Sequence, residues 1–253
     1  MLKTIFTVTF LVFFIFYGMA QDTNRLVIHP DIYLMPLGDS VYVHETWHAG
    51  EPYGRFPSNG LIIIREGQAV MIDTPWDNEK TRLLTEYLQD SMQVKLTLLI
   101  IGHFHNDCMG GLGYIHEQDI ESIANTMTVD KCRQLGKPVP RRSFTDSLIL
   151  DFNGTPLHCR FFGGGHTEDN IVVWLPPQRL LFGGCLIRSL HSSSLGNLSD
   201  AVPQTWDNTV ERIVAAYPDV QTVIPGHGAF GGPELLFHTL ERVKEHKSQN
   251  HNE

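Results

Sequence analysis

The stretch VKLTLLIIGHFHNDCMGG, residues 94–111, joins an apolar segment to a dense set of potential metal ligands. Its first part, Val94–Ile101, is short, apolar and partly β-branched, which predicts a buried strand. His103, His105 and Asp107 follow at two-residue spacing, so their side chains leave an extended backbone on one face. The two closing glycines allow a tight turn. A polar loop with hydrogen-bonding histidines is the alternative, but H-x-H-x-D directly after a strand favours a metal site.

The N-terminus has the pattern of a secretory signal peptide. Residues 1–20 hold one lysine, a long apolar run and small residues at Gly18 and Ala20, just before Gln21. The apolar run is short for a membrane span, which needs about 20 apolar residues. We therefore predict export to the periplasm and a mature catalytic domain of residues 21–253.

Composition limits the possible partners. The chain has 253 residues, 42% of them hydrophobic, with a formal net charge of −9. This length supports one sizeable core. An acidic exported protein is a poor candidate for binding nucleic acid or an anionic membrane. We also expect a monomer.

Strand and helix patterns alternate along the chain, which indicates an α/β fold. Residues 25–45 predict edge strands in a hairpin. We expect further strands at 61–65, 68–73, 94–101, 122–124, 141–150, 170–175, 180–184 and 223–225. Helical spacing of apolar residues covers 77–92, 111–117, 125–135, 205–217 and 233–246. Thr126 or Thr128 is the expected N-cap of the helix at 125–135.

Three more apolar strands end in glycine turns that carry a potential ligand. The three potential ligands are His166 in GGGHT, Cys185 in GGC and His227 in PGHG. A single turn histidine or buried cysteine is usually structural. The repetition of the arrangement at successive strand ends favours a shared site.

Six candidate ligands exceed what one tetrahedral zinc with an open position needs. They are His103, His105, His166, Asp107, Cys185 and His227. The set fits two metal ions, which share a hydroxide and stabilise a leaving group in known two-metal sites. A thiolate beside a carboxylate favours zinc over magnesium or calcium. We predict two Zn²⁺ per chain.

Other residues have two interpretations from sequence alone. Asp73 ends a buried strand and either bonds to a metal-ligand histidine or caps a turn. The segment Thr46–Pro57 is rich in glycine, proline and aromatic residues, and predicts a loop that either packs on the body or covers a substrate. The four cysteines, at positions 108, 132, 159 and 185, are widely spaced and are expected to be free thiols. Cys108 is expected to be a small buried residue near the site.

The ordered motifs resemble those of the metallo-β-lactamases, specifically the di-zinc subclass with a cysteine ligand. The motifs are HFHND at 103–107, GGGHT at 163–167, GGC at 183–185, LGNLSD at 195–200 and PGHG at 225–228. The resemblance covers essentially the whole mature chain and implies a four-layer αβ/βα sandwich. It also implies that His103, His105 and His166 hold one zinc. Asp107, Cys185 and His227 would hold the other.

The same resemblance implies roles around the metals. Arg188 stands where the family often has a lysine that binds the substrate carboxylate, and Asn197 matches a residue that polarises the lactam carbonyl. Asp107 and Asn197 are the expected catalytic residues. The segment 46–56 corresponds to a substrate-covering flap, with apolar contacts from Trp47, Tyr53 and Phe56.

The resemblance therefore implies hydrolysis of the β-lactam amide by a zinc-bound hydroxide, on penicillins, cephalosporins and carbapenems, with resistance to these antibiotics as the result. One alternative is a glyoxalase-like thioester or ester hydrolase of the same superfamily. The motif typical of such enzymes is H-x-H-x-D-H, whereas position 108, where its last histidine would stand, is cysteine here. The other alternative is a non-catalytic periplasmic zinc-binding protein, which would need no anion anchor such as Arg188.

Overall fold

The computed structural model describes residues 25–50 and 54–250. The predicted signal peptide, residues 1–20, and Tyr53 lie outside the described residues. Within the described part, no helix is long and apolar enough to cross a membrane.

The first sheet has eight strands in sequence order. They are β1 (Leu26–His29), β2 (Ile32–Gly38), β3 (Val41–Gly50), β4 (Gly54–Arg65), β5 (Gln68–Ile72), β6 (Lys95–Ile100), β7 (Glu121–Asn125) and β8 (Arg142–Phe144). Strands β1 to β5 pair antiparallel, whereas β5 to β8 pair parallel. The change occurs because helices connect the later strands, and a parallel pair requires such a crossover. These helices are α1 (Asn78–Met92), the short α2 (Asn106–Met109), α3 (Leu112–Glu117) and α4 (Thr126–Leu135).

The second sheet has five strands in the order β13-β12-β11-β10-β9. They are β9 (Ser147–Phe152), β10 (Thr155–Phe161), β11 (Ile171–Leu175), β12 (Leu180–Gly184) and β13 (Thr222–Pro225). Only β12 and β13 pair parallel, and α5 (Pro203–Ala216) lies between them in sequence. The last helix, α6 (Glu234–Asn250), packs beside α5.

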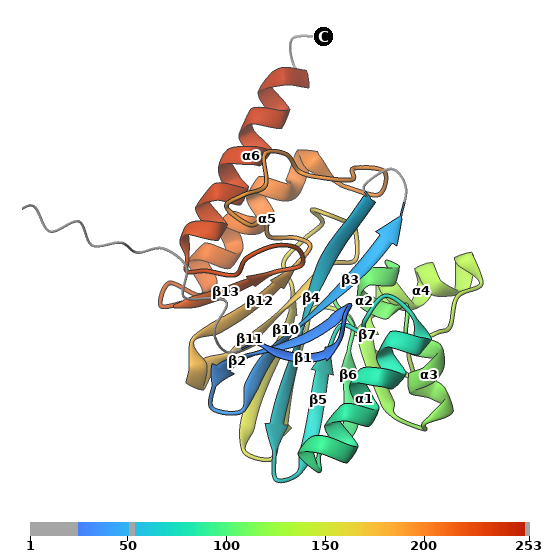
Figure 1. The fold of residues 1–253 in the computed structure, drawn as a ribbon. Helices are drawn as coiled ribbons and strands as arrows, with labels where there is room; N and C mark the ends of the chain where they lie inside the picture. The colour runs from blue at the N-terminus through green and yellow to red at the C-terminus, as the bar shows by residue number, and fades with distance from the viewer. Residues whose placement is uncertain (1–24, 51–53, 251–253) are drawn as a thin grey trace, which may run out of the picture.

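Three hydrophobic clusters define four layers (Figure 1). One cluster joins the first sheet to its helices, through residues such as Leu84 of α1 and Ile115 of α3. A second cluster lies between the two sheets, where Ile63 of β4 shares the core with Phe182 of β12. The third joins the second sheet to α5 and α6 around the fully buried Trp206. The predicted αβ/βα sandwich is confirmed.

The expected loop at Thr46–Pro57 is wrong in its described part. Strand β3 continues to Gly50 and β4 begins at Gly54, and all of β3 pairs with β4, from Val41 opposite Ile63 to Gly50 opposite Gly54. Sequence reasoning gave too much weight to glycine and proline in this segment. Pairing with β5 begins only at Leu61, so the first half of β4 is an edge on that side, where a proline is tolerated.

The N-cap of α4 is Asn125 and not Thr126 or Thr128. The Asn125 side chain accepts a hydrogen bond from the Met127 amide. The two threonine hydroxyls instead donate to groups outside the helix, Thr126 to the Phe144 carbonyl and Thr128 to a carboxylate. Asparagine and threonine are both good caps, so the sequence alone did not separate them.

Candidate metal centre

Loops at the ends of both sheets bring all six predicted ligands together. His103 and His105 follow β6, and Asp107 lies on α2. The remaining ligands come from the second sheet: His166 between β10 and β11, Cys185 directly after β12, and His227 after β13. The sandwich therefore positions the site at one edge, between its two sheets.

His103, His105 and His166 form a three-histidine cluster. Their ring centroids are 4.7, 4.9 and 5.2 Å apart, and one nitrogen of each ring lies within 4.8 Å of the others. His166 Nε2 is 3.3 Å from His105 Nδ1. His103 Nε2 is buried and has no hydrogen-bond partner among the described residues. An unpartnered buried nitrogen is costly, and a cation bound between the rings would satisfy it.

Outer contacts fix the direction in which two of these rings point. Cys108 Sγ lies 3.1 Å from His103 Nδ1, so the Nε2 atom of His103 faces the cluster. His105 Nε2 donates to Asp200 at 3.0 Å, which leaves Nδ1 of that ring with its lone pair toward the cluster. Such partners orient a ligand histidine and set its tautomer. Sequence reasoning assigned no role to Asp200, since nothing near it in the chain marks its contact with His105.

The second group, the Asp107/Cys185/His227 triad, is equally compact. Asp107 Oδ2 lies 3.2 Å from Cys185 Sγ and 3.1 Å from His227 Nε2, and those two atoms are 3.4 Å apart. Ligands of one tetrahedral zinc lie about 3.3–3.8 Å apart, given zinc bonds of about 2.0–2.3 Å. The triad therefore needs only a small expansion to hold zinc. His227 Nδ1 donates to the Pro57 carbonyl at 2.7 Å, which turns Nε2 toward the triad.

Charges within the triad stabilise one another. Burial opposes ionisation of Asp107, but the hydrogen bond from His227 and the nearby histidines bring its pKa well below the usual range. The hydrogen bond from Cys108 lowers the pKa of Cys185 against the effect of burial. Burial also opposes the charge on His227, yet the Cys185 sulfur and Asp107 raise its pKa well above the ordinary value. The triad thus favours a thiolate and a carboxylate, the ionised forms that bind metal.

Glycine at Gly226 permits the close approach of two ligand loops. A Cβ atom on Gly226 would lie 2.4 Å from Cys185 Sγ and 2.6 Å from the Cys185 nitrogen. A side chain there would push the loop of His227 away from Cys185. The predicted role of the glycine turns, close backbone approach, agrees with this geometry.

Asp73 lies in a turn, which is one of the two interpretations left open by its sequence. It has φ of +60° in a turn, and its buried carboxylate accepts from the Gly102 amide at 2.6 Å. Its side chain also bonds to the Cys108 thiol, and burial raises its pKa well above the usual value. Because Cys108 in turn contacts His103, Asp73 reaches a ligand histidine only through the thiol. The predicted direct bond is not present among the described contacts.

All four cysteines are free and buried, as predicted. Cys108 lies 2% exposed beside the ligands, in agreement with the small buried residue expected there.

Arg188 and Asn197 lie on neighbouring parts of the same loop. The Arg188 guanidinium is within 3.2–3.5 Å of the position that a Cβ on Gly196 would take, next to Asn197. Arg188 Nε is buried and has no hydrogen-bond partner in the described structure. Asn197 is exposed, and its Oδ1 accepts from the Ser199 amide at 3.0 Å, so its amide NH₂ points to the other side. Both residues therefore have donors available for a ligand.

The two described flap aromatics lie on opposite faces of the β3–β4 hairpin, since Trp47 pairs with Pro57 and Phe56 pairs with His48. Phe56 lies 6.0 Å from the His227 ring, measured between centroids. Trp47 instead stacks under Arg55. Trp76, which sequence reasoning missed, packs at 5.1 Å from Phe56 and 6.3 Å from His227. Its position three residues after Asp73, at the end of a buried strand, was the available signal.

Comparison with known proteins gives consistent results. A model described as the metallo-beta-lactamase superfamily matches residues 53–125. The metallo-beta-lactamase type 2 of Bacteroides fragilis is 42% identical over 90% of this chain and 91% of its own length. The solved metallo-beta-lactamase of Pontibacter korlensis superposes with a TM-score of 0.81 at 31% identity, covering 84% of this chain and 99% of that one. The metallo-beta-lactamase FIM-1 from Pseudomonas aeruginosa, solved in a mono-zinc form, superposes with a TM-score of 0.80 at 30% identity. The match covers 87% of this chain and 99% of that one.

Proposed function

The chain belongs to the metallo-β-lactamase family, and from this membership we infer that it is a zinc-dependent β-lactamase that hydrolyses the amide bond of the β-lactam ring. The observation that carries this function is the pair of adjacent ligand groups, the three-histidine cluster and the Asp107/Cys185/His227 triad. Relatives that match along nearly their whole length are named as such enzymes.

The two alternatives have less support. A glyoxalase-like thioester hydrolase is not favoured, since the named relatives at 34–42% identity are all metallo-β-lactamases. A non-catalytic zinc-binding protein has no need for the unpartnered guanidinium of Arg188 near Asn197.

We propose that the three-histidine cluster holds one zinc and the triad holds the other. The soft thiolate of Cys185 and the imidazoles suit zinc, and three protein ligands at each ion leave coordination positions open. When bound, zinc lowers the pKa of water from about 16 toward about 7 and polarises a carbonyl oxygen as a Lewis acid.

The protein's own groups bind and orient the substrate. Arg188 pairs with the substrate carboxylate, because a guanidinium offers two parallel N–H donors to a carboxylate. The Asn197 amide donates to the lactam carbonyl oxygen, where negative charge develops as the ring opens. Phe56 and Trp76 supply apolar surface beside His227 for the rest of the substrate.

We propose that Asp107 orients the attacking water. Its Oδ2 is engaged with Cys185 and His227, whereas Oδ1 lies 3.8 Å from His103 Nε2, between the two ligand groups. From there Oδ1 accepts a hydrogen bond from the water and directs its lone pair toward the carbonyl carbon.

We further propose that residues 1–20 direct export to the periplasm, that residues 21–253 form the catalytic domain, and that this domain acts as a monomer. The signal-peptide pattern of the first twenty residues supports export. Mass analysis of periplasmic protein should show a chain that begins near Gln21, and size-exclusion chromatography with light scattering should give one chain per particle.

Hydrolysis of one carbapenem and one penicillin by the purified protein tests the function. We expect turnover of both substrates, loss of turnover with a chelator, recovery with added zinc, and no effect of a serine-directed inhibitor. Thioester hydrolysis without β-lactam hydrolysis by the zinc-loaded protein would establish the glyoxalase-like alternative instead.

A further inference from the structure

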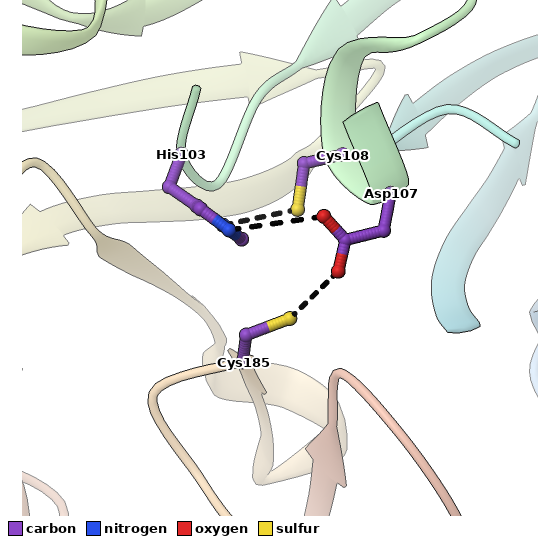
Figure 2. Close-up of side chains that lie close together, drawn as sticks. All are labelled: His103, Asp107, Cys108 and Cys185. Atoms are coloured by element: carbon purple, nitrogen blue, oxygen red, sulfur yellow. Dashed lines mark hydrogen bonds and ion pairs between the residues drawn. The ribbon is translucent and has the colours of Figure 1, made fainter. Parts of the chain in front are cut away.

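Two thiols face each other at the inner side of the metal centre. Cys108 lies on α2, and Cys185 follows β12 of the other sheet. Ligand atoms of these cysteines, His103 and Asp107 all lie within 4.8 Å of one another. Figure 2 shows the two sulfur atoms on either side of the Asp107 carboxylate. Both cysteines are at most 3% exposed, so water competes little for their sulfur atoms.

The proposed zinc chemistry uses only one of these thiols. Cys185 belongs to the triad, whereas Cys108 contacts His103 at 3.1 Å and lies within 4.8 Å of the Cys185 sulfur. Cys108 is therefore a soft potential ligand that the proposed zinc sites do not use, next to a second sulfur atom and a carboxylate.

We propose that Cys108 and Cys185 together form a two-thiolate site for a soft divalent metal ion such as Cd²⁺, with Asp107 as a further ligand. Thiolate ligands select soft metals. Two sulfurs at the zinc–sulfur bond length of about 2.3 Å lie about 3.8 Å apart on a tetrahedral ion, and the larger Cd²⁺ ion separates them further. The present separation, below 4.8 Å, requires only a small movement. Each sulfur binds through a lone pair, the Cys108 proton passes to solvent, and no oxidation occurs.

This site shares Cys185 and Asp107 with the triad and so rests on the proposed function. Its distinguishing feature is the number of sulfur ligands, which is two for the soft ion and one for zinc in the triad. If Cys108 serves only to orient His103, every bound ion will have at most one sulfur ligand.

Exchange of cadmium into the zinc-loaded full chain tests the proposal. Excess Cd²⁺ is added and removed by gel filtration, the retained metal is measured, and the thiolate-to-cadmium ultraviolet absorbance is recorded per chain. The variants are Cys108→Ser and Cys185→Ser. Cys159→Ser is the matched control, since Cys159 is a buried thiol in the core between the sheets.

We expect the absorbance of Cys108→Ser to be half that of the wild type, and that of Cys159→Ser to be unchanged. Full absorbance in Cys108→Ser, or no retained cadmium in the wild type, overturns the two-thiolate site. Unchanged absorbance in Cys185→Ser overturns the site and the triad of the proposed function together. Hydrolysis of a β-lactam by the zinc-loaded wild type is measured separately, so failure of the cadmium site leaves that function standing.

X-ray absorption at the cadmium edge of the exchanged wild type provides a measurement that needs no variant. Two sulfur neighbours on the ion in the triad region support the proposal, and one sulfur neighbour overturns it.

Discussion

Asn59→Ala is expected to weaken the second zinc without touching any ligand. Asn59 lies in β4, 3% exposed, and faces the loop that follows β13. Its side-chain NH₂ donates to the carbonyl of Pro225 at 2.9 Å and to that of Gly228 at 2.8 Å. Its backbone amide donates to Gly226 at 2.8 Å. Asn59 thus fixes both sides of His227.

The expected loss of stability follows from the two carbonyl groups that lose their hydrogen-bond donor. Each lost hydrogen bond contributes about 1 kcal/mol net, and a buried carbonyl left without a donor costs about 1–3 kcal/mol. Because alanine is small, water can reach the Gly228 carbonyl more easily than that of the buried Pro225. We expect the free energy of unfolding to fall by about 2–4 kcal/mol. The loosened His227 loop should raise the dissociation constant of the second zinc by about tenfold. Loss of a group that holds a metal ligand typically weakens metal binding by about 10–100-fold, and we expect the lower end of that range.

Two assays separate these effects. Urea unfolding with a chelator present, followed by tryptophan fluorescence, gives the stability of the metal-free protein. Competition with a chromophoric chelator gives the affinity of each zinc. Asn208→Ala is the control, because Asn208 is an exposed residue on α5, and its unfolding free energy should change by less than about 0.5 kcal/mol.

The reasoning is refuted if Asn59→Ala keeps wild-type affinity for the second zinc. A loss of stability alone would mean that Asn59 supports the sheet edge but does not position His227. A tenfold loss in affinity for both zincs would also count against it, since the three-histidine cluster has no contact with Asn59 among those described.

Three further substitutions test other parts of the site. Cys185→Ser replaces a thiolate with a neutral hydroxyl, so we expect about one zinc per chain and a lower kcat at saturating carbapenem, checked by metal analysis and steady-state kinetics. Arg188→Ala should keep both zincs and raise KM by roughly one to two decades, because a charge-assisted contact made in the ground state contributes about 1.5–3 kcal/mol. His44→Gln tests pH dependence: burial lowers the pKa of His44 to about 4, whereas the unfolded chain binds that proton near pH 6.5. The wild type therefore loses about 3 kcal/mol of its free energy of unfolding through this group as the pH falls from 6.5 to 4. Urea unfolding at several pH values should show a correspondingly smaller loss in the variant.

Sequence reasoning grouped the six candidate ligands because their signal is local. Each ligand stands within a few residues of the end of an apolar strand, and glycines beside it mark a turn that brings two backbones together. Strand ends of a layered α/β fold meet at one edge, so residues far apart in sequence could be grouped without knowledge of the packing. The hairpin of β3 and β4 could not be predicted in the same way. Whether Pro57 ends a strand depends on which neighbour pairs beside it, and pairing is not local.

The orientation of the ligands is the part that sequence could not supply, and the reason is physical. A histidine presents one nitrogen to a metal in a fixed direction when a partner holds the other nitrogen. Here the holding groups are Asp200 for His105, which is 95 positions away, and Pro57 for His227, which is 170 positions away. Neither group has a distinctive sequence signal, because a carboxylate in a loop or a backbone carbonyl serves many purposes. Cys108 is the exception, since it lies five positions after His103, and its dual contact with Asp73 and Cys185 appears only after the two sheets close around it. The candidate ligands are thus marked by short motifs, whereas the direction of their side chains depends on the packing of the whole sandwich.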